Sequence, residues 1–134
     1  MTSCATVPIT ERKQLTLYPE SVLNRQAARA YEKFKSKTKL IKSGSDLNNI
    51  IYVGERIQKA VNSFFLKKNL TDPTRNFSWE YILVDNKKVK NAWCMPGGKI
   101  AVFSGMLEIT KDNDGLATIL GHEIAHAVAK HSIE

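Results

Sequence analysis

The segment that most constrains this chain is "TILGHEIAHAVAKH", near its C-terminal end. It places His122 and His126 four residues apart, with Glu123 directly after the first histidine. Residues four apart lie on one face of an α-helix, one turn from each other, so the two imidazoles can bind one cation together. The spacing therefore predicts a helix through this segment, with a metal ion on one of its faces.

Zinc is the metal that suits this pair, because it favours imidazole nitrogen in a tetrahedral shell. Glu123 lies at the edge of the histidine face, where a carboxylate can take a proton from water and pass it to a leaving amine. The sequence thus predicts a zinc hydrolase with His122 and His126 as metal ligands and Glu123 as general base. The alternative interpretation is two surface histidines beside a solvated glutamate. Small residues around the motif favour a closely packed helix: Ala125, Ala127 and Ala129.

A third protein ligand is not evident from the spacing. His131 follows His122 by nine residues, which places it on the opposite side of an ideal helix. Glu134 follows His126 by eight residues, roughly 12 Å along the axis. A metzincin-type site is excluded, because it needs glycine and histidine where the chain has Ala129 and Ser132. A ligand inside the sequence would have to come from other residues, of which the candidates are Glu55, Glu80, Glu108 and Cys94.

Hydrophobic periodicity predicts two helices in the first half of the chain. Apolar residues at spacings of three and four begin after Pro19 and end near Phe34. A second stripe runs from Leu47 to Phe65, with Asp46 as the expected N-cap. Residues 1–18 show no periodicity and are expected to form a flexible tail, so the folded part is predicted to cover 19–134.

The period then changes to two, which is typical of strands. The expected strands are "SWEYILVD", "VKNAWCM" and "KIAVFSG", separated by the turn sequences "DNKK" and "PGG". A last helix is expected to begin near "KDND", capped by Asn113 or Asp114. This order predicts an α+β fold in which helices precede a small antiparallel sheet and the motif helix follows it.

Composition fits one globular domain of 134 residues, and no apolar run approaches the roughly 20 residues that span a bilayer. The net charge is +7, and five lysines lie between Lys33 and Lys42. A solvated helix end is the simpler interpretation of this run, and contact with an anionic membrane surface is the second. Nucleic-acid binding is disfavoured because aromatic residues do not alternate with the lysines. Two cysteines make no disulfide framework, and Cys94 is expected to be a small, partly buried apolar residue.

Residues 91–131, "NAWCMPGGKIAVFSGMLEITKDNDGLATILGHEIAHAVAKH", resemble the HtpX and CAAX-prenyl-protease family of zinc metallopeptidases. The resemblance is greatest to the branch of soluble envelope proteins that includes a mitochondrial inner-membrane stress protease. It implies a gluzincin site: one Zn²⁺ held by His122 and His126, Glu123 as base, and a third ligand from a glutamate on a later helix. It also implies that Asn91, Ala92 and Trp93 form a strand that pairs with an extended substrate.

The start of the chain adds a second resemblance. "CATVPITERKQL" is similar to the mature beginning of bacterial envelope lipoproteins, with Cys4 as the lipidation candidate. The family then implies a periplasm-facing enzyme of protein quality control, with unfolded or misassembled proteins as substrates. On this interpretation the chain is the N-terminal part of a catalytic domain, truncated after the motif helix, inactive alone and prone to self-association. The alternative is a non-catalytic fragment or pseudo-enzyme that acts as a binding or assembly module at a membrane surface.

Overall fold

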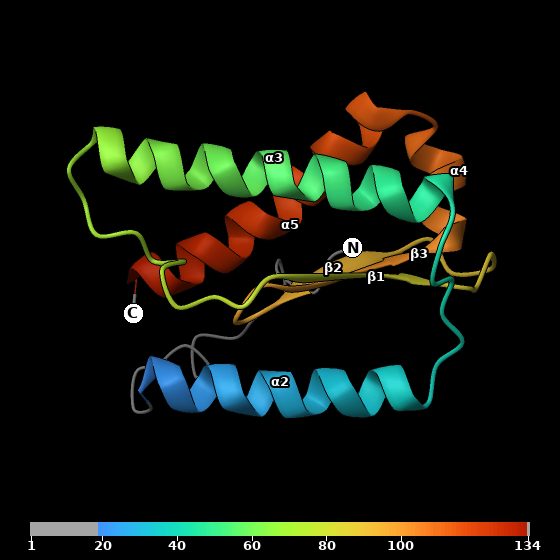
Figure 1. Ribbon diagram of the computed structural model, residues 1–134, viewed down its shortest axis with the longest axis horizontal. Helices are drawn as coiled ribbons and strands as arrows, with labels where there is room; N and C mark the ends of the chain where they lie inside the picture. Colours follow the sequence, from blue (N-terminus) through green and yellow to red (C-terminus); the bar gives the residue numbers. More distant parts are fainter. Residues whose placement is uncertain (1–18, 134) are drawn as a thin grey trace.

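The computed structural model describes residues 19–133, which form helices around a small sheet. Figure 1 shows the sheet in the middle, with α2 on one face and α3 and α5 on the other. The α+β class is therefore confirmed. The expected tail 1–18 and the lipidation candidate Cys4 lie outside the described residues. In chain order the elements are α2 (Glu20–Ser36), α3 (Ser45–Lys67), β1 (Glu80–Val84), β2 (Ala92–Met95), β3 (Lys99–Phe103), the 3-10 turn η2 (Ser104–Met106), α4 (Leu107–Thr110) and α5 (Asn113–Ile133).

The sheet has the order β1-β3-β2, and the expected all-antiparallel arrangement is wrong. β2 and β3 form an antiparallel hairpin, whereas β1 and β3 run parallel. The "PGG" turn closes the hairpin because Gly97 and Gly98 adopt φ values of 90° and 89°, where glycine is favoured. The "DNKK" segment does not fold β2 back onto β1. Instead the N–H of Gly105 donates to the carbonyl oxygen of Asn86 at 3.1 Å, so this loop crosses the end of β3.

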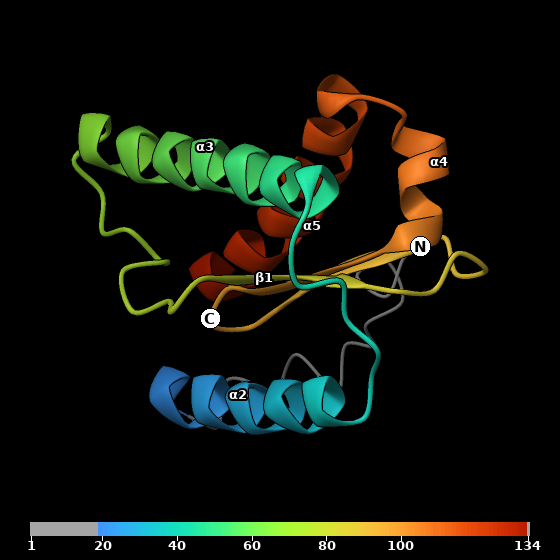
Figure 2. The ribbon, with the colours of Figure 1, turned by 45° about the vertical axis from the view of Figure 1, so that its right-hand side comes forward.

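The core has two parts because β3 is covered on both faces. On one side Ile100 and Val102 pack with residues of α3 and α5, which Figure 2 shows crossing above the sheet. On the other side Ala101 packs against α2, together with Tyr31 and Trp93. The largest fully buried side chains of the two parts are Tyr31, Ile50, Leu83, Ile100, Val102, Leu120 and Ile124. Burial on both faces explains why the strand in the centre is almost wholly apolar.

The predicted helices are confirmed, but both predicted caps are wrong. α3 begins after Gly44, so Asp46 lies within the first turn. At α5 the carboxylate of Asp112 accepts a hydrogen bond from the N–H of Gly115 at 2.8 Å, which makes Asp112 the capping residue instead of Asn113 or Asp114. The acidic residues in these first turns still complement the positive end of the helix dipole. None of the helices described between residues 19 and 133 is long and apolar enough to cross a membrane.

A charged cluster fixes α2 to the sheet. The Lys35 ammonium donates to the Glu80 carboxylate at 2.6 Å, and the Lys99 ammonium lies 3.7 Å from the other carboxylate oxygen. Burial raises the pKa of Glu80, but the hydrogen bond from Lys35 and the charges of both lysines outweigh it, so the pKa of this carboxyl lies below its ordinary value. Burial beside the negative charge of Glu80 raises the pKa of Tyr31. The ion pair is therefore the polar link between α2 and β1.

Two helical glycines give a matched stability test. A Cβ at Gly54 in α3 would overlap the ring of Tyr81, whereas a Cβ at Gly121 in α5 would meet open space. Gly54→Ala is expected to lower the free energy of unfolding by about 1–3 kcal/mol through overpacking. Gly121→Ala is expected to raise it by roughly 0.5–1 kcal/mol, because alanine loses less backbone entropy in a helix. Urea unfolding followed by circular dichroism measures both, and equal effects of the two variants would contradict the packing around Tyr81.

The Glu80 ion pair predicts a pH dependence of stability. Because the folded-state pKa of Glu80 lies below its ordinary value of 4.5, its contribution is present above that value and is lost as pH falls. The carboxylate is 35% exposed, so solvent screening keeps the contribution modest. Glu80→Gln is expected to cost about 1 kcal/mol at neutral pH and almost nothing in strong acid. The control is Glu55→Gln, an exposed change on α3. A cost for Glu80→Gln that does not change with pH would exclude this role.

Candidate metal centre

The motif lies within α5, which packs against both α3 and β2. Its buried side is made of Leu116, Leu120, Ile124 and Ala127. The prediction that all three alanines of the motif region pack closely is wrong, because Ala125 and Ala129 are exposed on the outer side. The apolar side of α5 thus anchors the helix, while His122 and the two alanines lie on its exposed side.

His122 and His126 lie side by side on the continuous helix. Their ring centroids are 4.4 Å apart with an angle of 65° between the rings; His122 is exposed and His126 is half-buried. Two imidazoles that share one tetrahedral zinc ion at 2.0–2.1 Å have centroids about 5 Å apart. The observed separation is close to this value, so the pair fits two positions of a zinc shell.

Glu123 differs from the two histidines because it is buried, with only 4% of the residue exposed. It falls on the side of α5 that carries Leu120 and Ile124, next to the histidine face. A carboxylate in such a place must be held by polar partners, since burying an isolated charge is costly. Burial restricts the motion of Glu123, and the sequence places it directly after His122 on α5.

The described residues do not supply a third ligand. Among residues 19–133, histidine, cysteine, aspartate and glutamate form no group of three that could hold a metal ion. Glu55 and Glu108 are exposed on α3 and α4, and Glu80 is paired with Lys35 beneath α2. Cys94 is a half-buried thiol on β2, packed against the core that faces α5. Glu134 lies outside the described residues.

β2 is the outer strand of the sheet on the side of α5. The Asn91 carbonyl accepts the N–H of Phe103 at 3.0 Å, so by alternation the backbone groups of Ala92 point away from β3. The amide oxygen of Asn91 accepts the N–H of Ala92 at 2.9 Å. Trp93 has its backbone directed to β3 and its ring against Phe34 of α2, with centroids 5.3 Å apart. Of the three predicted substrate-binding residues, Ala92 therefore has the outward backbone groups.

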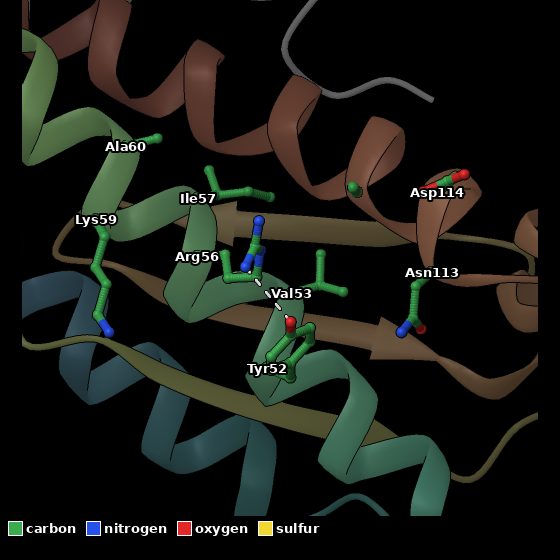
Figure 3. Close-up of a pocket in the computed structure, with 9 residues that line it drawn as sticks. Tyr52, Val53, Arg56, Ile57, Lys59, Ala60, Asn113 and Asp114 are labelled. Carbon is green, nitrogen blue, oxygen red and sulfur yellow. Dashed lines mark hydrogen bonds between the residues drawn. The ribbon is translucent and has the colours of Figure 1, made fainter.

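A separate groove lies between α3 and the beginning of α5, and its volume is about 700 Å³. Figure 3 shows Arg56 directed at Tyr52, whose hydroxyl accepts its hydrogen bond at 3.4 Å. Asn113 and Asp114 form the opposite wall. His122 lies nine residues further along α5, about 13 Å away along the axis. The groove and the histidine pair are therefore distinct places, and sequence reasoning did not predict the groove because its walls come from segments far apart in the chain.

Comparison with known proteins gives a consistent picture. Residues 52–134 match the profile of Peptidase family M48. The mitochondrial metalloendopeptidase OMA1 of Arabidopsis thaliana is 47% identical over 64 residues, which are 48% of this chain and 13% of that protein. OMA1 of Saccharomyces cerevisiae is 44% identical over 57 residues, 42% of this chain and 16% of the relative. The metalloprotease YcaL of Escherichia coli is 40% identical over 43 residues, 32% of this chain and 16% of YcaL.

These matches correct one prediction and limit another. The expected location, a bacterial envelope with a lipid anchor, is wrong, because the OMA1 relatives from plant and yeast are named mitochondrial proteins. The matches support the peptidase family as a whole and do not single out the HtpX and CAAX-prenyl-protease branch. The chain spans less than one fifth of the length of the OMA1 relatives cited above. Since the family profile covers more than half of the sequence, the chain belongs to Peptidase family M48, a family of metallopeptidases.

Proposed function

We propose that this protein is a zinc-dependent metalloendopeptidase that acts on unfolded or misassembled protein chains. The observation that carries the proposal is the pairing of His122 with His126 on α5, with the buried Glu123 directly after His122 in the helix. Membership of Peptidase family M48 supports the reaction class. The metalloendopeptidase names of the OMA1 relatives support it as well.

Each residue of the motif has a distinct role in this proposal. The imidazoles of His122 and His126 would hold the cation through one ring nitrogen each, and solvent or groups other than residues 19–133 would complete the shell. The chemistry that zinc supplies when bound is Lewis acidity toward a carbonyl group and water. The Glu123 carboxylate accepts a proton from the attacking water and returns it to the amine that leaves. Its burial keeps it positioned for both transfers.

The substrate class follows from the position of β2. An extended peptide can add to an outer strand through main-chain hydrogen bonds, and only an unfolded segment presents its backbone in this way. Ala92 offers its outward groups, and Asn91 must release the N–H of Ala92 for that bond to form. Asn91 and Ala92 are thus proposed as substrate-binding residues. Trp93 contributes indirectly, since its packing against Phe34 holds the strand in place.

A second candidate function is a binding module of the same fold that does not turn over. The observation that favours it is the presence of only two grouped donors among residues 19–133. The two functions differ in one respect that can be measured: the enzyme needs Glu123 for turnover, whereas a binding module needs neither Glu123 nor the metal.

Zinc binding tests the metal centre without reference to catalysis. His122→Ala and His126→Ala are each expected to weaken zinc binding by at least about tenfold, because each removes one of two protein donors. Calorimetric titration with zinc measures the affinity. The matched control is His131→Ala, since this residue follows His122 by about two and a half turns of α5, on the opposite side of an ideal helix, and should leave the affinity unchanged. Equal losses in all three variants would rule out the assigned pair.

Replacement of Glu123 tests the reaction. In a chain whose metal shell is completed by a third protein ligand, Glu123→Gln keeps the size of the side chain but removes the base, so cleavage of unfolded casein is expected to fall by about 10²–10⁴-fold while zinc binding is kept. Release of labelled peptides in the presence of zinc measures the rate. Glu108→Gln, an exposed change on α4, is the control that should retain activity. Near-normal activity of Glu123→Gln would contradict its role, and zinc binding without any cleavage by a chain with the complete metal shell would favour the binding module.

A further inference from the structure

The fold brings two lysine-rich segments together at one end of the sheet. One is 37–42, which connects α2 to α3, and the other is 85–91, which connects β1 to β2. Both lie where β1 and β3 end and β2 begins, on the right of Figure 1. We call this region the lysine end. Its six lysines, all exposed, are Lys37, Lys39, Lys42, Lys87, Lys88 and Lys90.

The two segments are held in place by backbone hydrogen bonds. The N–H of Asp85 donates to the carbonyl oxygen of Lys39 at 2.9 Å, and the N–H of Ile41 donates to that of Leu83 at 2.9 Å. The second segment packs directly on Gly105, where a Cβ would overlap the carbonyl oxygens of Lys87 and Val89. The lysines are therefore presented together by the fold, although about 45 residues separate the segments in the sequence.

Charge is concentrated at this end. The two segments contain six lysines and one aspartate, which gives +5 out of the net charge of +7 for the whole chain. Asp85 is already paired with Lys39 at 3.4 Å. Within residues 19–133 the other five lysines of the lysine end make no ion pair. Five mutually repelling ammonium groups that form no ion pair with a carboxylate make a surface that attracts a negatively charged partner.

We infer that the lysine end binds the surface of a bilayer that contains anionic phospholipid. Neither segment contains arginine, although the chain has five arginines elsewhere. Arginine is the residue suited to bidentate recognition of individual phosphates, whereas lysines act as point charges on a diffuse anionic surface. The two segments contain no aromatic residue on which an unpaired base could stack. These features favour a lipid surface over nucleic acid.

Binding of a bilayer at the lysine end is compatible with the proposed function and does not depend on it. α5 begins near α4 at the same side of the molecule and runs away from the lysine end, so its last residues lie at the opposite side in Figure 1. A bilayer in contact with the lysine end would thus leave the histidine face of α5 open to solvent.

Vesicle binding tests the inference with the 134-residue chain. Sedimentation with vesicles of phosphatidylcholine containing about 30% phosphatidylserine is compared with sedimentation with pure phosphatidylcholine. Each lysine near an anionic surface strengthens binding about fivefold. The triple variant Lys87→Gln, Lys88→Gln and Lys90→Gln is therefore expected to bind anionic vesicles on the order of 100-fold more weakly. The double variant Lys37→Gln and Lys42→Gln is expected to lose about 25-fold.

The matched control removes three charges from a different place. Lys59→Gln, Lys67→Gln and Lys68→Gln change exposed lysines in and directly after α3 and should leave vesicle binding almost unchanged. Circular dichroism confirms that each variant is folded. The inference is overturned if the control loses as much affinity as the triple variant, or if the unaltered chain binds pure phosphatidylcholine equally well. Tighter binding to a DNA duplex of about 20 base pairs than to anionic vesicles at the same salt would also overturn it.

Discussion

Burial of β3 on both faces is the constraint on which the rest of the structure depends. This strand pairs with β1 on one side and β2 on the other, and its residues Ile100, Ala101 and Val102 are inaccessible to solvent. One face requires cover from α3 and α5, and the other requires α2. Because β3 occupies the centre, β2 becomes the outer strand next to α5. The proposed substrate site needs a sheet edge beside the motif helix. The central position of β3 provides it, because it leaves β2 at the edge.

The sequence allowed the elements to be predicted but not their neighbours. Stripes of apolar residues identified α2 and α3, which each bury one side, and short apolar runs bounded by turn sequences identified the three strands. The order and direction of the strands could not be predicted from these patterns. An apolar run such as "KIAVFSG" fits a central strand in a parallel or an antiparallel pair, and only the loop that crosses at Asn86 and Gly105 decides between them. The N-cap of α5 was missed by one or two residues because aspartate and asparagine occur in a row before this helix. The N-cap of α3 was missed because Gly44 has no capping side chain.

The site was predictable where its residues are close in sequence. The four-residue spacing of His122 and His126 determines their contact once a helix forms, and the 4.4 Å separation of the rings follows from it. The burial of Glu123 could not be read from that spacing, because it depends on which side of α5 meets β2 and α3. Trp93 illustrates the same limit: the alternation of a strand predicts that neighbours face opposite sides, but not that its ring meets α2 while Ala92 faces α5. Long-range placement therefore had to come from the structure.

Glu123 is both a buried residue of α5 and the proposed general base. A carboxylate on the apolar side of α5 costs stability, since it replaces a side chain that could pack with Leu120 and Ile124. A solvent-exposed position would avoid this cost but leave the side chain free to adopt many rotamers, and a general base must be oriented to within hydrogen-bond reach of its proton. The position one residue after His122 is the compromise: it is shielded enough to be fixed and still adjacent to the histidine face. Helix α5 therefore carries one buried carboxylate among its apolar core contacts, directly next to the first of its two histidines.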